Sequence, residues 1–420
     1  MRRLAAFVLT ASIGASPALA QDVAVRARRL HTVSGAAIDD GVVVIRGGKI
    51  EAVGPASSVT IPEGMKTLTS AVATPGLVDA HCVIGLAGYL NQPHDQDQHD
   101  ASAPIQPELR AIDAYNAREP LIEWVRGFGV TTIHTGHGPQ ALVSGQTMVA
   151  KTRGNTVEEA AIVPVAMIAA TLGEGSRESG DRGDRGARSS APGTAGKQLA
   201  MLREALVGAA EYRRKLAAAA GERVDEAGAA KRPDRDLRKE ALVELLEKKL
   251  PLLLTAHRHQ DIVSAIRLAR EFDLRLVLDG AAEAYVVLDE IRAAGVPVIA
   301  HAPMARFSGE LENASRETPR KLLEAGIPIA LQSGYESYVP KTRVVLYEAA
   351  IAAAQGLGPD RALRAITLDA ARILGLESRL GSLEPGKDGD LALYDGDPFE
   401  YTSHCVATVI DGMVVFEGAR

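Results

Sequence analysis

The sequence predicts an α/β protein, a (β/α)8 (TIM) barrel joined to a small β-sandwich formed from both chain ends. Two observations predict this fold. In the middle of the chain, short apolar runs alternate with helical patterns, which is typical of parallel strands linked by helices. At both ends, β-runs and turn residues replace that alternation, which indicates one sheet domain built from both termini.

The β-rich ends carry hairpin signals. Residues 41–50 contain two β-runs around Gly47–Gly48, and residues 406–416 contain two more around Asp411–Gly412. We therefore expect residues 21–75 and 382–420 to form the composite β-sandwich domain, and residues 76–381 to form the barrel.

Eight strands and their connecting helices are expected in the barrel. The predicted parallel strands are 77–81, 130–135, 144–151, 162–169, 252–257, 274–280, 297–301 and 328–333. The clearest predicted helices are 260–272, 282–294, 319–325, 344–355 and 359–374. Site residues are expected at the carboxyl ends of the strands, where barrels form their functional mouth.

Residues 173–250 form an insertion between the fourth and fifth predicted strands. Residues 173–196 are rich in Gly, Ser, Arg and Asp, cannot bury much apolar surface, and are expected to be a mobile loop. Residues 197–250 are rich in Ala, Leu, Glu, Lys and Arg and should be helical, with a break near residues 231–233. This segment is either a lid or oligomer contact, or a solvated helical hairpin.

The first twenty residues are typical of a signal peptide. Arg2 and Arg3 form a basic start, residues 4–15 are apolar, and Ala18-Leu19-Ala20 fits the cleavage rule, so the mature chain would begin at Gln21. The alternative, a membrane anchor, is disfavoured because the run is too short to span a bilayer. We expect a periplasmic or secreted protein with no membrane association after cleavage.

Charge and cysteine content exclude some classes. The 47 basic and 53 acidic residues are interspersed and give a net charge of −6, so nothing suggests a nucleic-acid surface. The two cysteines, Cys82 and Cys405, do not make a disulfide framework and are interpreted as buried thiols.

Four stretches resemble the amidohydrolase superfamily, most closely its imidazolonepropionase-like and N-acetylglucosamine-phosphate-deacetylase-like members. They are 68–81 (LTSAVATPGLVDAH), 129–133 (GVTTI), 380–394 (LGSLEPGKDGDLALY) and 409–415 (VIDGMVV). The resemblance covers nearly the whole mature chain. It implies hydrolysis of C–N or related bonds, with one or two divalent metals that polarise the carbonyl and acidify a bound water.

Most of the metal-ligand positions that the resemblance implies are substituted. The first strand of the family ends in His-x-His, which corresponds to His81 and Val83 here. The histidines of the fifth and sixth strands correspond to Thr255 and Gly280, and the aspartate of the eighth corresponds to Gly334. The resemblance also implies a lysine that bridges the two metals, and Lys151 is the candidate for it. The alternative interpretation is that Lys151 is a surface lysine. A catalytic zinc needs three protein ligands, so the two-metal mechanism is disfavoured.

Histidines at predicted strand ends could form a replacement metal site. His81, His134, His257 and His301 are the candidate ligands, because imidazole suits zinc and several other divalent metals. The alternative is that each is a hydrogen-bonded polar residue lining a former active-site cavity.

A polar loop follows the first strand and supplies substrate-binding candidates. His94, Asp95, Asp97 and His99 combine imidazole and carboxylate groups, and Tyr335 lies after the eighth strand. The alternative is a polar loop that only covers the mouth. Ser144, Ser333, His134 and Asp279 also lie near strand ends, but there is no nucleophile-elbow motif to support Ser/His/Asp catalysis.

Two functions therefore remain open. The first is an exported hydrolase acting on a non-peptide C–N bond, with a rearranged or depleted metal site that holds one divalent metal, zinc first, or none. The second is a catalytically silent relative, a pseudoenzyme, that binds a ligand or pairs with an active paralogue. Either would take a small molecule in the barrel mouth, alone or as a homo-oligomer.

Overall fold

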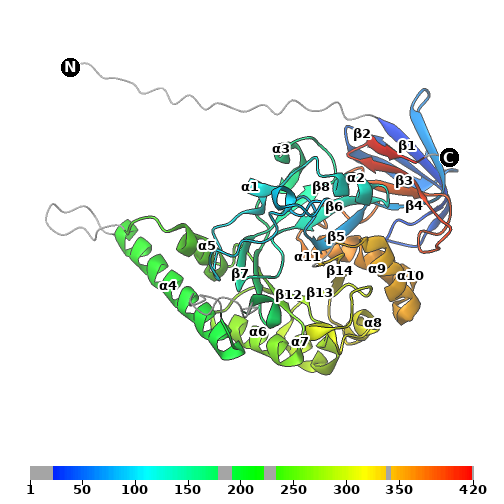
Figure 1. Ribbon diagram of the computed structural model, residues 1–420. Coiled ribbons are helices and arrows are strands. Elements are labelled where there is room, and N and C mark those ends of the chain that lie inside the picture. Colours follow the sequence, from blue (N-terminus) through cyan, green and yellow to red (C-terminus); the bar gives the residue numbers. More distant parts are fainter. Residues whose placement is uncertain (1–21, 178–191, 222–232, 337–341, 419–420) are drawn as a thin grey trace, which may run out of the picture.

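The computed structural model describes residues 22–177, 192–221, 233–336 and 342–418, and shows a mixed α/β fold with three sheets (Figure 1). The predicted signal peptide, residues 1–20, lies outside the described residues. So do residues 178–191 of the predicted mobile loop and most of the predicted helix break near 231–233.

Both chain ends contribute to one seven-stranded sheet, with the order β17-β16-β15-β4-β1-β2-β3. β4 joins the two ends, since it pairs in parallel with β1 and antiparallel with β15. The blue and red strands in Figure 1 show this juxtaposition. The strands are β1 (Val23–Leu30), β2 (Ile38–Arg46), β3 (Lys49–Pro55), β4 (Lys66–Pro75), β15 (Leu391–Tyr394), β16 (Cys405–Ile410) and β17 (Met413–Glu417). The joint domain is thus built as one sheet in the described residues, and its closure into a sandwich stays a prediction.

The middle of the chain forms two further sheets, with the orders β14-β13-β12-β11-β10-β7 and β5-β6-β8-β9. Neighbouring strands from β10 to β14 are parallel, as are β5 and β6. Their bounds lie close to the predicted ones. They are β5 (Leu77–Cys82), β6 (Val130–Thr135), β7 (Val143–Gln146), β8 (Met148–Lys151), β9 (Ala161–Val163), β10 (Ile168–Thr171), β11 (Leu252–Ala256), β12 (Leu276–Gly280), β13 (Val298–Ala300) and β14 (Ile329–Leu331).

The third predicted strand is not parallel to its neighbours. It is divided at Thr147 into β7 and β8, which pair antiparallel with β10 and β6 respectively. The fourth predicted strand is also two strands, because β9 pairs with β8 and β10 pairs with β11. The prediction of eight parallel strands is therefore wrong here, since apolar runs do not reveal strand direction.

The two central sheets adjoin at both margins. On one side a single residue, Thr147, separates β7 from β8. On the other side, Gly334 follows β14, and its backbone N–H donates to the carbonyl of His81 in β5 at 3.1 Å. Cys82 and Gly334 also form an isolated parallel β-bridge between their backbones. The carboxyl ends of β5 and of β11–β14 therefore meet, and this is where the candidate site lies.

The helices pack around these sheets. None in the described ranges has the length and apolar character needed to cross a lipid bilayer. The longer helices are α2 (Pro120–Arg126), α4 (Ala195–Gly221), α5 (Leu237–Leu246), α6 (His259–Glu271), α7 (Leu288–Ala294), α8 (Thr318–Glu324), α9 (Val345–Ala352), α10 (Pro359–Ala365) and α11 (Leu368–Ile373). The shorter elements are α1 (Ala111–Ala114), α3 (Val157–Ala160), η1 (Pro93–Asp95), η2 (Glu174–Ser176), η3 (Ala284–Val286), η4 (Gly309–Leu311) and the π-turn η5 (Ala353–Leu357).

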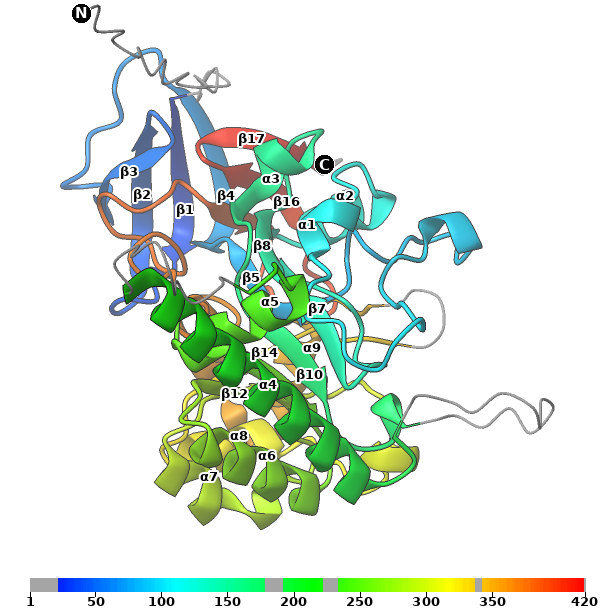
Figure 2. The ribbon, with the colours of Figure 1, turned by 90° about the vertical axis from the view of Figure 1, so that its left-hand side faces the viewer.

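The helices of the insertion are part of the main core. α4 packs against α5 and α6, and it crosses the molecule diagonally in Figure 2. Its Leu202, Leu206 and Tyr212 are buried in the same apolar cluster as residues of the two central sheets. The interpretation as a solvated hairpin is therefore wrong for α4 and α5, because one face of each is covered.

Candidate functional site

A buried histidine–aspartate pair lies at the centre of the site. The Nδ1 of His81, at the end of β5, lies 3.0 Å from Oδ1 of Asp279 in β12, and the two side chains are 6% and 4% exposed. The Nε2 of His81 is buried and has no hydrogen-bond partner within the described part of the chain. Because Asp279 accepts from Nδ1, the free Nε2 is the nitrogen that can exchange a proton with a bound molecule.

Opposing effects set the ionisation of this pair. Burial lowers the pKa of His81, but the charge and hydrogen bond of Asp279, helped by Asp79, outweigh burial and leave the pKa raised. For Asp279, burial raises the pKa, but His81, Thr255 and His257 outweigh it and leave the pKa lowered. The carboxylate is therefore ionised and stabilises a proton on His81.

Asp279 is held by two further donors. The Thr255 hydroxyl donates to Oδ2 at 2.6 Å, and the Gln332 amide donates to Oδ1 at 2.9 Å. Thr255 lies in β11, Gln332 follows β14, and His81 lies in β5. Side chains from three strands therefore hold the Asp279 carboxylate in place. With three donors directed at its two oxygens, Asp279 orients His81 and has little capacity left for a metal.

Gly280 has no room for a side chain in this structure. Its backbone has φ +75°, and a Cβ there would lie 2.5 Å from Cε1 of His257. The His257 ring therefore occupies the space that a side chain at Gly280 would need. His257 faces the same cavity as His81, its buried Nδ1 has no partner among the described residues, and burial lowers its pKa to about 4.

The other two candidate histidines already have hydrogen bonds. His134 places Nδ1 at 2.6 Å from the Ala80 carbonyl and Nε2 at 2.7 Å from the Thr147 hydroxyl. Burial, with the charge of His81, lowers its pKa to about 3, so it is neutral. His301 lies near the carbonyls of Ala302 and Ser315, at 3.2 and 3.3 Å, and burial lowers its pKa. His134 therefore links β5 to Thr147 through its hydrogen bonds, whereas His301 lines the same cavity as His81 and His257.

Lys151 does not lie near the His81–Asp279 pair. Its ammonium pairs with Asp388 at 2.8 Å, with Asp390 at 3.1 Å and with Asp411, at the junction with the seven-stranded sheet. The prediction of a bridging lysine assumed a parallel third strand, and that premise is wrong. Because β8 is antiparallel to β6, Lys151 pairs with Thr132, before His134 along β6, and so lies away from the carboxyl ends.

Ser333 pairs with Asp79 rather than with a histidine. Its hydroxyl donates to Oδ2 of Asp79, and its N–H donates to Oδ1 at 3.0 Å. Asp79 Oδ1 also lies 3.4 Å from the backbone N of His81. Burial, partly offset by these hydrogen bonds, raises the pKa of Asp79 to about 6. Asp79 thus ties the end of β5 to the residue after β14, and the described contacts contain no Ser/His/Asp triad.

Two cavities that share lining residues lie at this end of the strands, and the inner one is lined by the His81–Asp279 pair. The inner one, about 70 Å³, is lined by His81, Thr255, His257, Asp279, His301, Gln332 and Ser333, among others. The outer one, about 390 Å³, shares Pro139, Thr255, His257 and Tyr335 with it and adds His99, Thr171, Arg177 and Glu310. Thr171 Oγ1, Arg177 Nε and Glu310 Oε2 are buried without partners in the described ranges. Polar groups of this kind favour a ligand that can satisfy them.

The predicted substrate-binding residues fall into two groups. His99 and Tyr335 line the outer cavity. His94, Asp95 and Asp97 line a separate cavity beside η1, which shares no lining residue with the two at the strand ends. Asp95 organises its own loop, because it accepts the backbone N–H groups of Leu90 and Gln92 at 2.9 and 2.7 Å.

The donors do not make a three-ligand metal set. His134 and Asp279 are taken up by hydrogen bonds, which leaves His81 and His257 with free nitrogens. Within the described ranges, no group of three or more His, Cys, Asp or Glu side chains has an arrangement that could hold a metal ion. The family's catalytic metal therefore does not fit the side chains present.

Sequence reasoning missed the partnership of Asp279. A single charged residue in the apolar run Leu276–Gly280 was the available signal, because a buried charge requires a partner. Thr255 was considered only as a substituted ligand position, and no local sequence pattern shows that Thr255 and Gln332 donate to Asp279.

Known proteins are similar to this chain in sequence and in fold. The sequence of residues 319–416 matches the sequence model of the amidohydrolase family. An imidazolonepropionase from Rhizorhabdus wittichii is 26% identical over 401 residues, which covers 88% of this chain and 92% of that protein.

Solved structures extend the similarity. An amidohydrolase from Thermotoga maritima is 30% identical, with a TM-score of 0.85 over 94% of this chain and all of that one. An adenosine deaminase from Xanthomonas campestris, solved with bound zinc, is 18% identical with a TM-score of 0.55 over 94% of this chain and 92% of that one, and shows the fold alone.

Proposed function

We propose, from the premise that the chain belongs to the amidohydrolase superfamily, that it hydrolyses a non-peptide C–N bond of a small polar molecule. The observation that carries the proposal is the buried His81–Asp279 pair, which lines a cavity and leaves Nε2 of His81 without a hydrogen-bond partner among the described residues. The inner cavity has room for water, and the outer cavity has a volume typical of small-molecule sites.

In the proposed reaction, His81 is the general base and then the general acid. Nε2 takes a proton from a water molecule as its oxygen attacks the carbonyl carbon. The C–N bond then breaks, and Nε2–H returns the proton to the leaving nitrogen. Asp279 accepts the Nδ1–H throughout, which sets the tautomer and stabilises the imidazolium.

We further propose that the site is metal-depleted. This is supported by Val83, Thr255, Gly280 and Gly334 at the positions that correspond to family ligands, and by the hydrogen bonds that occupy Asp279. No step of the reaction above is assigned to a metal, because the donors do not fit one.

Metal content tests this part of the proposal. Protein expressed with excess zinc is expected to hold less than ~0.2 metal ion per chain, because two free imidazoles bind zinc weakly. Its release of amine from a panel of N-acyl and cyclic amides should survive dialysis against a chelator. Near-stoichiometric metal, with activity lost on chelation and restored by zinc, would contradict a depleted site.

The pH dependence tests the role of His81. A base must be neutral, and the pKa of His81 is raised, so kcat/KM should rise with pH through a midpoint above the ordinary value of about 6.5. Asp279→Asn removes the charge that holds the proton, so the midpoint should move to lower pH while the plateau falls. An unchanged midpoint in this variant would show that Asp279 does not set the ionisation of His81.

A second function, ligand binding without catalysis, is favoured by one observation. The raised pKa keeps part of His81 protonated near neutral pH, and an imidazolium cannot act as a base. This function fits a silent relative that pairs with an active paralogue. It predicts binding of a small molecule in the outer cavity and no turnover at any pH up to about 9, which is above the ordinary histidine pKa.

Three architectural points stand as proposals with the function. We propose that the two central sheets close into a (β/α)8-type barrel, supported by their contacts at Thr147 and Gly334. We propose that the seven-stranded sheet belongs to a sandwich domain. We propose export to the periplasm or medium, supported by the first twenty residues, and the mass of the exported chain should correspond to a start at Gln21.

A further inference from the structure

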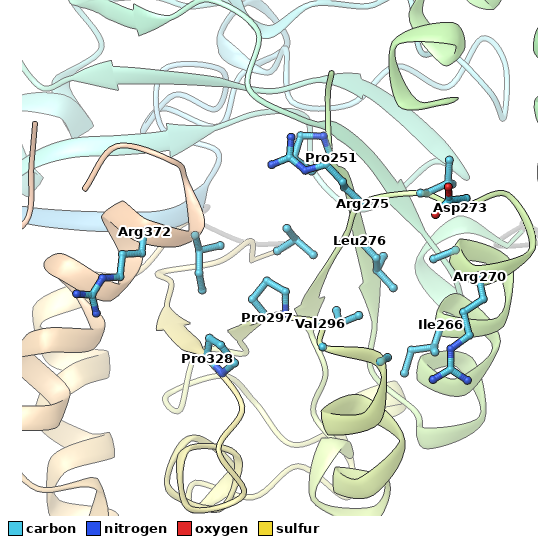
Figure 3. A pocket seen from close by; sticks show the side chains of 16 residues that line it. Pro251, Ile266, Arg270, Asp273, Arg275, Leu276, Val296, Pro297, Pro328 and Arg372 are labelled. Atoms are coloured by element: carbon cyan, nitrogen blue, oxygen red, sulfur yellow. The ribbon is translucent and has the colours of Figure 1, made fainter. Parts of the chain in front are cut away.

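The loop after β13 forms part of the wall of both cavities at the carboxyl ends of the strands. β13 leads from Pro297, which lines a separate cavity of about 680 Å³ at the amino ends (Figure 3), to the carboxyl ends, where residues 301–311 make up the β13 loop. Four residues of this loop line the inner cavity and one lines the outer cavity: His301, Ala302, Ala305 and Leu311, and then Glu310. The position of the β13 loop therefore shapes the site.

One buried carboxyl group is hydrogen-bonded to this loop. Glu348, on α9, is 0% exposed, and its Oε2 accepts the backbone N–H of Met304 at 2.8 Å. Met304 lies within a turn in which the Ala305 N–H donates to the Ala302 carbonyl at 2.9 Å. Ala302 and Ala305 both line the inner cavity. Glu348 is therefore bonded to the middle of the turn that contributes two residues to the cavity wall.

The burial of Glu348 is costly for α9. Glutamate is almost never fully buried unless it is paired. Within the described residues Glu348 forms no ion pair, its Oε1 is buried without a hydrogen-bond partner, and the bond to Met304 is the only one that its side chain makes. An apolar side chain at this position of the helix would avoid these costs. The contact with the β13 loop is thus what a glutamate supplies here and an apolar residue cannot.

We propose that Glu348 is a positioning residue for the hydrolysis, because its carboxyl group fixes the β13 loop through the Met304 N–H in the arrangement that shapes the cavity beside His81. The effect on rate rests on the proposed function, whereas the fixing of the loop can be measured without a substrate. A shift of about 1 Å in groups that position a substrate can cost about 10²-fold in rate, so one hydrogen bond at this wall has a measurable effect.

Glu348 fixes the loop best as a neutral acid. Burial raises its pKa to about 8, the Met304 N–H and Arg343 lower it only in part, and Asp79 and Glu336 raise it further. A carboxyl group whose pKa is raised in the closed arrangement stabilises that arrangement when it is protonated. This stabilisation is complete below the ordinary value of 4.5 and is lost as the pH rises toward about 8.

Hydrogen–deuterium exchange of the peptide that contains Met304 tests the fixing of the loop in the purified protein. At pH 5, Glu348→Leu removes the acceptor and should make the Met304 amide exchange about tenfold faster than in the wild type. Glu348→Gln keeps an acceptor oxygen and should preserve the wild-type rate. At pH 8, with the intrinsic pH dependence removed, the wild type should exchange about tenfold or more faster than Glu348→Gln, because only the glutamate ionises.

Steady-state kinetics test the consequence for the reaction. At pH 7, kcat/KM for the hydrolysed amide should fall about tenfold or more in Glu348→Leu and stay within about twofold of the wild type in Glu348→Gln. Rescue by the conservative variant separates positioning from a general loss of stability, and thermal unfolding establishes that both variants fold.

The matched control is Glu324→Leu. Glu324, on α8, is exposed and pairs with Arg320 at 2.8 Å, so its loss should leave the exchange of Met304 and kcat/KM unchanged. Slow exchange of Met304 in Glu348→Leu, or equally fast exchange in Glu348→Leu and Glu348→Gln, would overturn the proposal. So would an unchanged kcat/KM in a Glu348→Leu protein whose Met304 exchanges fast.

A failure of the proposed function is distinguishable from a failure of this inference. No hydrolysis by the wild type would contradict the proposed function alone, and the exchange rates would still decide whether Glu348 fixes the loop. If Glu348→Leu does not fold, the wild type and Glu348→Gln at pH 8 decide, and equal exchange rates would overturn the proposal.

Discussion

Replacing His81 by glutamine is expected to lower kcat/KM for the hydrolysed amide by about 10²–10⁴-fold, the usual contribution of a general acid–base. Glutamine keeps a polar group near Asp279, but it cannot take a proton from water near neutral pH. The loss should appear in kcat, because proton transfer belongs to the transition state and not to substrate binding. Steady-state kinetics at several pH values measure it.

The control for this variant is His404→Gln. His404 is exposed on the seven-stranded sheet domain, away from both cavities at the strand ends, so its loss should leave kcat/KM within about twofold, as surface changes usually do. Circular dichroism and thermal unfolding establish that both variants fold. A His81→Gln enzyme that keeps more than about a third of its activity would remove His81 from the mechanism, since general bases contribute far more.

Replacing Lys151 by methionine is expected to lower the free energy of unfolding by about 3–5 kcal/mol, because buried carboxylates lose their central cation. Lys151 is 1% exposed. Burial lowers its pKa, but Asp390, Asp411 and Asp388 together outweigh burial and leave the pKa raised. For Asp388, burial raises the pKa, but Lys151 and its other cations outweigh it and lower the pKa to about 2. Urea unfolding of the variant measures the loss.

Acid should weaken the same cluster in the wild type. A carboxyl group with a lowered pKa contributes stability above its unfolded pKa, near 3.9, and loses that stability as the pH falls toward about 2. The Asp388 contribution should therefore disappear between about pH 4 and pH 2 in the wild type and be small in Lys151→Met.

Lys49→Met is the matched control for Lys151. Lys49 also pairs with Asp388, at 2.5 Å, but its side chain is half exposed. Its replacement should therefore lower the free energy of unfolding by only about 0–1 kcal/mol. Equal losses from the two lysines would show that burial does not strengthen the Lys151 contacts.

Sequence reasoning succeeded where the signal is local. The TPGLVDAH stretch predicted the strand β5 and placed His81 at its end, because a Pro–Gly turn followed by an apolar run is a local signal. The hairpins of the chain ends were predicted for the same reason, from Gly47–Gly48 and Asp411–Gly412. The resemblance to amidohydrolases also depended on local motifs, and the comparisons confirmed it.

Sequence reasoning failed where a contact joins distant residues. His81 and Asp279 are 198 positions apart, and neither stretch records the other. Lys151 was assigned to the mouth because an apolar run has no visible direction. The antiparallel pairing of β8 with β6 instead carries it to the seven-stranded sheet and its aspartates.

Local residue patterns predicted the α/β class and most of the strands and helices, and the resemblance placed Val83, Thr255, Gly280 and Gly334 at the positions that correspond to family ligands. Which polar side chains meet depends on contacts between strands that lie far apart in the sequence. Burial then made the outcome consequential, because a buried ionised group without a partner is too costly to keep. Asp279 therefore pairs with His81, and Lys151 pairs with three aspartates. The proposed chemistry of the site depends on the His81–Asp279 pair.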